Sequence, residues 1–176
     1  GVSSAASDVY KRQPMYYAAR IAKEKYPDAK IVFVGPCVAK RKEAQRDEAV
    51  DFVMTFEEVS SIFDAFEVNL EIVQPYAMEF SSVREAHGFA QAGGVMGAVK
   101  AFLKMEADKI NAIQVSDLNK KNIGTLRAYA KSGKAPGQFI EVMACEGGCI
   151  TGPSTHSGSN GKRQLVQELA KQEKTY

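Results

Sequence analysis

The chain has 176 residues, a formal net charge of +2 at pH 7, 45% hydrophobic residues and 25% charged residues. This composition is typical of one globular domain or of part of one. The small net charge, without a basic stripe, argues against a nucleic-acid partner, and no apolar run reaches the roughly 18 residues of a membrane span. We therefore expect a soluble, cytoplasmic protein that binds neither nucleic acid nor membrane.

The first thirteen residues differ in kind from the rest. Residues 1–13 look like translated adaptor sequence, so we expect a non-native leader there. Native sequence would then begin at about Pro14 and run to residue 176, as a fragment of a longer domain.

Helix and strand signals in the first half alternate. Pro14 suits the first position of a helix that ends before Pro27. Thr55 is expected to cap a helix over residues 56–66, with Glu58 completing a capping box. Between these helices we expect a strand at 30–35, a charged loop at 40–48 and a strand at 50–55.

The second half continues this alternation. In order we expect an irregular connection at 67–92, an apolar helix at 95–105, a strand at 112–115, a helix capped by Asp117 or Asn119 that runs to about Lys131, a strand at 138–143 and a polar helix at 162–174. Because strands alternate with helices, the sequence predicts an α/β fold with a largely parallel sheet.

All three cysteines follow predicted strands. Cys37 comes after the strand at 30–35, and both Cys145 and Cys149 come after the strand at 138–143. Open α/β sheets bind their ligands at the carboxyl ends of strands. This placement therefore favours a cofactor site, which Cys37 would join if the two strands were neighbours in one sheet. The odd number of cysteines argues against a disulfide framework.

The cysteines are suited to more than one chemistry. Thiolates are soft ligands for iron–sulfur clusters and for zinc, and the glycines between Cys145 and Cys149 allow the backbone to approach a cofactor closely. Three cysteines leave a four-ligand site one ligand short. A zinc site that adds His156 is one alternative, although its spacing fits no common zinc signature. Small buried core thiols are another.

Three segments carry more specific motifs. Residues 35–43 read Gly-Pro-Cys-Val-Ala-Lys-Arg-Lys-Glu, residues 141–149 read Glu-Val-Met-Ala-Cys-Glu-Gly-Gly-Cys, and residues 88–96 hold a Gly-Gly-Val-Met stretch. In type and order they resemble the H-cluster domain of iron-only hydrogenases and of their sensory and cluster-assembly relatives. The resemblance runs from Pro14 to about Gly152 and implies parallel-sheet lobes flanked by helices.

The resemblance implies a set of metal ligands. Cys37, Cys145 and Cys149 would bind a 4Fe-4S cluster. Cys149 would also bridge to a di-iron centre that carries CO, cyanide and a dithiolate.

The resemblance also implies residues around the di-iron centre. Lys40 would hydrogen-bond a cyanide, because an ammonium donates charge-assisted hydrogen bonds to a small anion. Lys40, Met143 and Cys149 would be the catalytic residues, while Pro14, Phe89 and Met143 would line the pocket. Met143 and Phe89 equally suit an ordinary core, and the basic run that begins at Lys40 suits a solvated surface.

The sequence departs from the family pattern at several positions. Gly35 replaces a methionine, Arg41 replaces a lysine, and residues 150–154 stand where many catalytic members have three glycines. The upstream Thr-Ser-Cys-Cys-Pro segment, which supplies the remaining cubane ligand and a proton-donating thiol in the family, is not in the chain. These departures are typical of sensory or divergent branches.

We therefore expect a fragment of an iron-only hydrogenase, whose parent enzyme interconverts hydrogen with protons and electrons. A ferredoxin-like electron carrier, or an N-terminal iron–sulfur domain, would be its redox partner. Two alternatives are a hydrogen-sensing regulatory protein with a similar cluster and a non-catalytic iron–sulfur scaffold or assembly protein.

Overall fold

The computed structural model describes residues 13–46, 48–74, 76 and 82–172 of the chain. It divides into two compact units, residues 1–69 and residues 70–176. Each unit is described by itself. Most of the expected leader, and the last residues of the helix expected at 162–174, lie outside the described residues.

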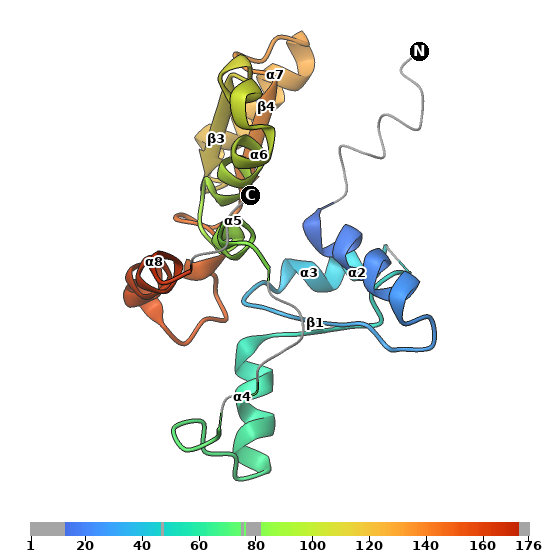
Figure 1. Cartoon of the computed structure of the whole chain (residues 1–176). Helices are drawn as coiled ribbons and strands as arrows, with labels where there is room; N and C mark the ends of the chain where they lie inside the picture. Colours follow the sequence, from blue (N-terminus) through green and yellow to red (C-terminus); the bar gives the residue numbers. More distant parts are fainter. Residues whose placement is uncertain (1–12, 47, 75, 77–81, 173–176) are drawn as a thin grey trace. The chain divides into compact units, whose positions relative to one another are not determined.

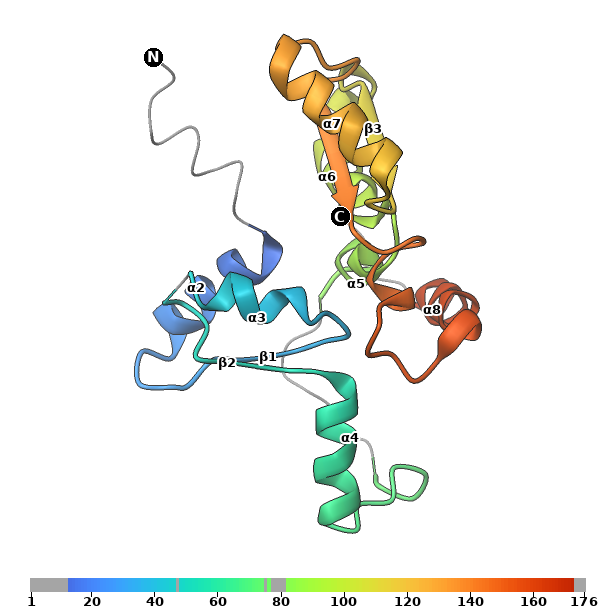
Figure 2. The same cartoon turned by 180° about the vertical axis from the view of Figure 1, so that it is seen from behind.

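The first unit contains a two-stranded parallel sheet and helices (Figure 1). Its elements are α2 (Pro14–Lys25), β1 (Val32–Val34), α3 (Ala39–Ala44), β2 (Phe52–Met54) and α4 (Phe56–Ala65). The strands pair with Val32 opposite Phe52. In the opposite views of Figures 1 and 2, α2 and α3 lie on the same side of the strands.

The core of the first unit lies between this sheet and its helices. Met15 and Ala19 of α2 are buried with Val50, and Phe33 and Val53 of the strands pack against them. Because side chains alternate along a strand, Val32, Val34 and Phe52 point to the opposite face, where they are exposed.

Two polar contacts fix the ends of these strands. The Asp51 carboxylate accepts the N–H of Ile31 at 2.8 Å and the ammonium of Lys30 at 3.2 Å, which fastens β2 to β1. Thr55 and Glu58 form the capping box expected at the start of α4. Both halves of that box are present, since each residue bonds the backbone N–H of the other.

The second unit holds a second parallel pair of strands. Its elements are α5 (Arg84–His87), η1 (Gly88–Ala90), α6 (Gly94–Leu103), η2 (Lys104–Lys109), β3 (Ala112–Ser116), α7 (Lys120–Ser132), β4 (Phe139–Met143), η3 (Cys149–Thr151), η4 (Gly158–Asn160) and α8 (Gly161–Ala170). The strands pair over their full length, from Ala112 opposite Phe139 to Ser116 opposite Met143. Figures 1 and 2, seen from opposite sides, show α6 over one face of these strands and α7 over the other.

The structure confirms the α/β class and the order of the predicted elements, with three corrections. The charged stretch expected as a loop contains α3, and the connection expected to be irregular contains α5 and η1. β1 pairs with β2, and β4 pairs with β3, so the described residues form two sheets. The condition under which Cys37 would join the other cysteines, that its strand pairs with β4, is therefore not met among the described strands. None of the helices described is both long enough and apolar enough to cross a membrane.

Candidate functional site

The cysteine loop, residues 145–149, follows directly on β4. Cys145 and Cys149 are both half-buried. The N–H of Gly148 donates to the carbonyl of Cys145 at 3.1 Å and closes a tight turn between the two cysteines. Gly147 and Gly148 have φ values of +81° and +101°, a region that favours glycine. One short turn therefore carries both thiols.

Gly148 brings this loop against another stretch of backbone. A Cβ on Gly148 would overlap the amide nitrogen of Ala92 and would lie 2.6 Å from the carbonyl carbon of Gln91. The N–H of Ala92 donates to the carbonyl of Gly147 at 3.0 Å. The cysteine loop is thus seated on the glycine loop, residues 88–94, which connects α5 to α6.

Glu141 holds the glycine loop from the middle of β4. Its carboxylate accepts the N–H of Gly93 at 2.8 Å with one oxygen and the N–H of Met96 at 2.7 Å with the other. The residue is only 5% exposed. Since these amides belong to the first turn of α6, the carboxylate serves as the cap of that helix and lies at the positive end of its dipole.

Ser116 holds the cysteine loop from the end of β3. Its hydroxyl accepts the N–H of Gly147 at 3.0 Å and donates to the carbonyl of Cys145 at 3.4 Å. The sequence motifs gave neither Ser116 nor Glu141 a role. For Glu141 the sequence did contain a signal, an acidic residue inside an apolar strand. A charge buried in such a strand requires hydrogen-bond partners.

Cys37 lies in the first unit, half-buried, between β1 and α3. The N–H of Gly35 donates to the carbonyl of Met54 at 3.0 Å, and the carbonyl of Cys37 accepts the N–H of Lys40 at 3.3 Å. A Cβ on Gly35 would lie 2.8 Å from the ring of Phe33. The Phe33 ring thus occupies space into which a methionine at residue 35 would begin to extend.

The Lys40 side chain is paired with a carboxylate of its own helix, α3. Its ammonium forms an ion pair of 2.6 Å with Glu43, and these side chains are 12% and 13% exposed. It also donates to the side-chain carbonyl of Gln13. The other carboxylate oxygen of Glu43 is buried and has no hydrogen-bond partner among the described residues. Glu43 is therefore an ion-pair partner of Lys40.

The structure places the predicted site residues in two groups. Pro14, Cys37 and Lys40 belong to the first unit, and Phe89, Met143, Cys145 and Cys149 belong to the second. Within the second unit, η1, which contains Phe89, contacts η3, which begins at Cys149. Phe89 and Met143 are half-buried. Their role beside a di-iron centre stays a prediction.

The cysteine loop offers ligands that suit an iron–sulfur cluster or zinc. It offers two soft thiols on one turn, together with a glycine pair that leaves no Cβ at the contact with the glycine loop. The described residues contain no group of three His, Cys, Asp or Glu side chains arranged to hold a metal ion, and His156 is exposed. Cys145, Cys149 and His156, the members of the alternative zinc site that lie in the second unit, are therefore not arranged around one metal ion.

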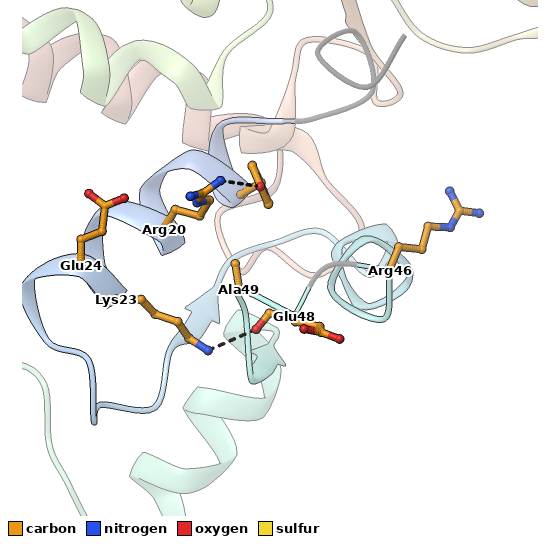
Figure 3. Close-up of a pocket in the computed structure, with 7 residues that line it drawn as sticks. Arg20, Lys23, Glu24, Arg46, Glu48 and Ala49 are labelled. Atoms are coloured by element: carbon orange, nitrogen blue, oxygen red, sulfur yellow. Dashed lines mark hydrogen bonds between the residues drawn. The ribbon is translucent and has the colours of Figure 1, made fainter. Parts of the chain in front are cut away.

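A separate surface pocket of about 570 Å³ lies in the first unit, lined by α2 and by Arg46, Glu48 and Ala49 (Figure 3). Polar groups in its walls bond one another. Arg20 donates to the hydroxyl of Tyr16 at 3.2 Å, and Lys23 donates to the carbonyl of Glu48 at 3.1 Å. None of the three cysteines lines it, so it is distinct from the candidate site.

The fold and the cysteine loop together define a domain of the iron–sulfur hydrogenase type. Residues 9–153 match the family described as Iron only hydrogenase large subunit, C-terminal domain. The chain belongs to this family.

Several curated relatives are named as cytosolic Fe-S cluster assembly factors. The chain is 28% identical to the cytosolic Fe-S cluster assembly factor narfl of Danio rerio, with 81% of this chain and 46% of the relative covered. It is 27% identical to the nuclear prelamin A recognition factor of Danio rerio, with 78% and 39% covered. The chain therefore spans less than half the length of these relatives.

Solved FeFe-hydrogenases share the fold. One, from work on stepwise H-cluster assembly, aligns with a TM-score of 0.55 at 20% identity and covers 88% of this chain and 57% of its own. A second, from work on oxygen inactivation, gives 0.59 at 20% identity and covers 92% and 59%. The family and the names of the curated relatives support an association of this chain with iron–sulfur chemistry.

Proposed function

We propose that this chain supplies three ligands, Cys37, Cys145 and Cys149, to a 4Fe-4S cluster, and that its protein is an iron–sulfur scaffold or assembly factor. The observation that carries the proposal is the cysteine loop, in which two cysteines flank a glycine pair whose backbone packs against the glycine loop. The cluster-assembly relatives support the assembly role. Gly35 and residues 150–154, where the catalytic pattern is lost, also favour it.

The protein contributes soft thiolates and a half-buried setting, in which a cluster is protected from water. When bound, such a cluster supplies one-electron chemistry or a unit for transfer to another protein. The fourth ligand would come from elsewhere in the full-length protein. We place the protein in the cytoplasm, as its cluster-assembly relative is named.

The ligand set is tested by anaerobic cluster reconstitution of the full-length protein. Cys37→Ser, Cys145→Ser and Cys149→Ser should each lower bound iron and sulfide to well below one cluster per chain. His156→Ala is the matched control, because His156 is exposed and should leave the iron content unchanged. Zinc in place of iron, released by His156→Ala, would contradict the proposal.

Hydrogen conversion is the second candidate function. The motifs around Cys37 and Cys149, and the fold shared with FeFe-hydrogenases, favour it. In that case a di-iron centre with CO, cyanide and a dithiolate would lie beside Cys149, Lys40, Met143, Phe89 and Pro14. A ferredoxin-like carrier or an N-terminal iron–sulfur domain would then exchange electrons with the site.

Infrared spectroscopy of the fully matured, full-length protein separates the two functions. A scaffold that holds only the cubane shows no CO or cyanide bands. A hydrogenase or a hydrogen sensor shows both, and Lys40→Ala then weakens them because an anionic ligand loses a charged donor. If hydrogen activity is found, Cys149→Ser should abolish it.

A further inference from the structure

We propose that Ser116 and Glu141 are positioning residues that lock the cysteine loop and the glycine loop into one preformed unit. The use of this unit for an iron–sulfur cluster rests on the proposed function. The locking itself does not, because every contact that makes it lies within the protein.

The first contact is made by Ser116 inside the turn of the cysteine loop. Its hydroxyl accepts from the amide of Gly147 and donates to the carbonyl of Cys145. The same carbonyl accepts the N–H of Gly148. The backbone between the cysteines is thus held from the end of β3 as well as by its own turn.

The second contact is made by Glu141 at the start of α6. Both carboxylate oxygens are used, one on Gly93 and one on Met96. Gly93 has a φ of +88°, so its amide is turned in a direction that a residue with a side chain rarely adopts. With 5% exposure, the carboxylate has little water to replace these donors.

The contacts of Ser116 and Glu141 act on neighbouring loops because β3 and β4 are paired. Ser116 lies opposite Met143 in the register, and Glu141 lies opposite Gln114. The strand pair therefore carries a hydroxyl toward one loop and a carboxylate toward the other. The loops then join directly, through the bond from Ala92 to Gly147 and the close approach of Gly148.

This arrangement has two consequences for a cluster. Because the loop is already ordered, the thiols of Cys145 and Cys149 can bind a cluster without a further loss of backbone entropy. The N–H of Gly147 is also occupied by Ser116 and is withheld from sulfur. Hydrogen bonds to cluster sulfurs are one of the factors that set the reduction potential, so Ser116 should influence the potential as well as the fold.

Amide hydrogen exchange of the 176-residue chain without metal tests the locking alone. The amides of Gly93, Met96 and Gly147 should be protected. Ser116→Ala should speed exchange at Gly147 by about tenfold or more, the factor for one lost hydrogen bond. Glu141→Leu, which removes both acceptor oxygens, should do the same at Gly93 and Met96. Thr125→Ala in α7, whose hydroxyl donates to the carbonyl of Lys121 in the same helix, should change none of them. Fast exchange at these amides in the unaltered chain would overturn the proposal.

Reconstituted full-length protein tests the link to the cluster. Ser116→Ala should shift the midpoint potential upward and alter the electron paramagnetic resonance spectrum of the reduced cluster, while Ser116→Thr, which keeps the hydroxyl, should restore both. A protein that binds no cluster would refute the proposed function and leave the exchange result standing. A cluster whose potential and spectrum are unchanged in Ser116→Ala would refute the positioning role.

Discussion

At the residue scale, Gly148 combines a φ of +101° with contact to the backbone of residues 90–92. In the variant Gly148→Ala, the alanine would therefore adopt an unfavourable φ. Its Cβ would also force the cysteine loop away from residues 90–92. We expect a loss of about 1–3 kcal/mol in the free energy of unfolding and a lower cluster content after reconstitution. Urea unfolding and iron analysis of the variant measure both effects.

The matched control is Gly124→Ala in α7, where a Cβ would meet nothing within 4 Å. Alanine in an exposed helix interior should stabilise the chain by about 0.5–1 kcal/mol. Equal effects of the two substitutions would show that the contact with residues 90–92 does not matter.

Single residues also mark the limit of prediction from sequence. The motifs singled out Cys145 and Cys149 because two cysteines on either side of a glycine pair have few structural uses, and both glycines adopt positive φ values. The contacts of Ser116 and Glu141 join residues 31 and 45–48 positions apart in the sequence. Such contacts depend on which strands pair, and local patterns do not specify that pairing.

At the element scale, Asp51 joins the two strands of the first unit. The N–H of Ile31, followed by Lys30 and Lys23, lowers the pKa of its carboxyl from the ordinary value of 3.8. Because the pKa is lower in the folded chain, the stability gained is fully present above that value and is lost as the pH falls through the folded-state pKa.

Asp51→Asn should therefore reduce stability at pH 7 and flatten the loss of stability as the pH falls below 3.8. Chemical denaturation at several pH values measures this slope. Asp28→Asn, at an exposed turn before β1, is the control and should keep the slope of the unaltered chain. An unchanged slope in Asp51→Asn would refute the role of this carboxylate.

The start of α4 offers a second test at this scale. Thr55 is 3% exposed and accepts the N–H of Glu58 at 3.3 Å, so Thr55→Ala removes one half of the capping box. The expected loss is about 1 kcal/mol in unfolding free energy. Thr55→Ser keeps the acceptor and should recover most of it. Equal losses in Thr55→Ala and Thr55→Ser would assign the effect to packing of the methyl group.

Elements with strong local signals were predicted well, and those without them were not. The capping box fixed the start of α4, and Asn119, one of two expected caps, bonds the N–H of Asn122 at the start of α7. α3 was missed because its Lys-Arg-Lys run resembles a solvated loop, yet ion pairs of Lys40 with Glu43 and of Arg41 with Glu58 accompany the helix.

At the scale of the whole molecule, the chain buries few large side chains. None of the described residues with a large side chain is less than 2% exposed. On the outer face of the first sheet, Val32 is 45% exposed and its register partner Phe52 is 58% exposed. Apolar strand faces of this kind associate with other apolar surfaces in water.

We therefore expect the 176-residue chain to self-associate as its concentration rises, with this strand face as one of the contacts. The double variant Val32→Lys/Phe52→Glu should lower the association, because it replaces the apolar pair with opposite charges that attract across the two strands. Light scattering across a concentration series measures the mass. Gln164→Glu/Gln167→Lys, which adds the same two charges to exposed positions of α8, is the control and should leave the mass unchanged. If the strand-face variant associates as strongly as the control, the contact lies on another apolar surface, and the assignment to the β1–β2 face is wrong.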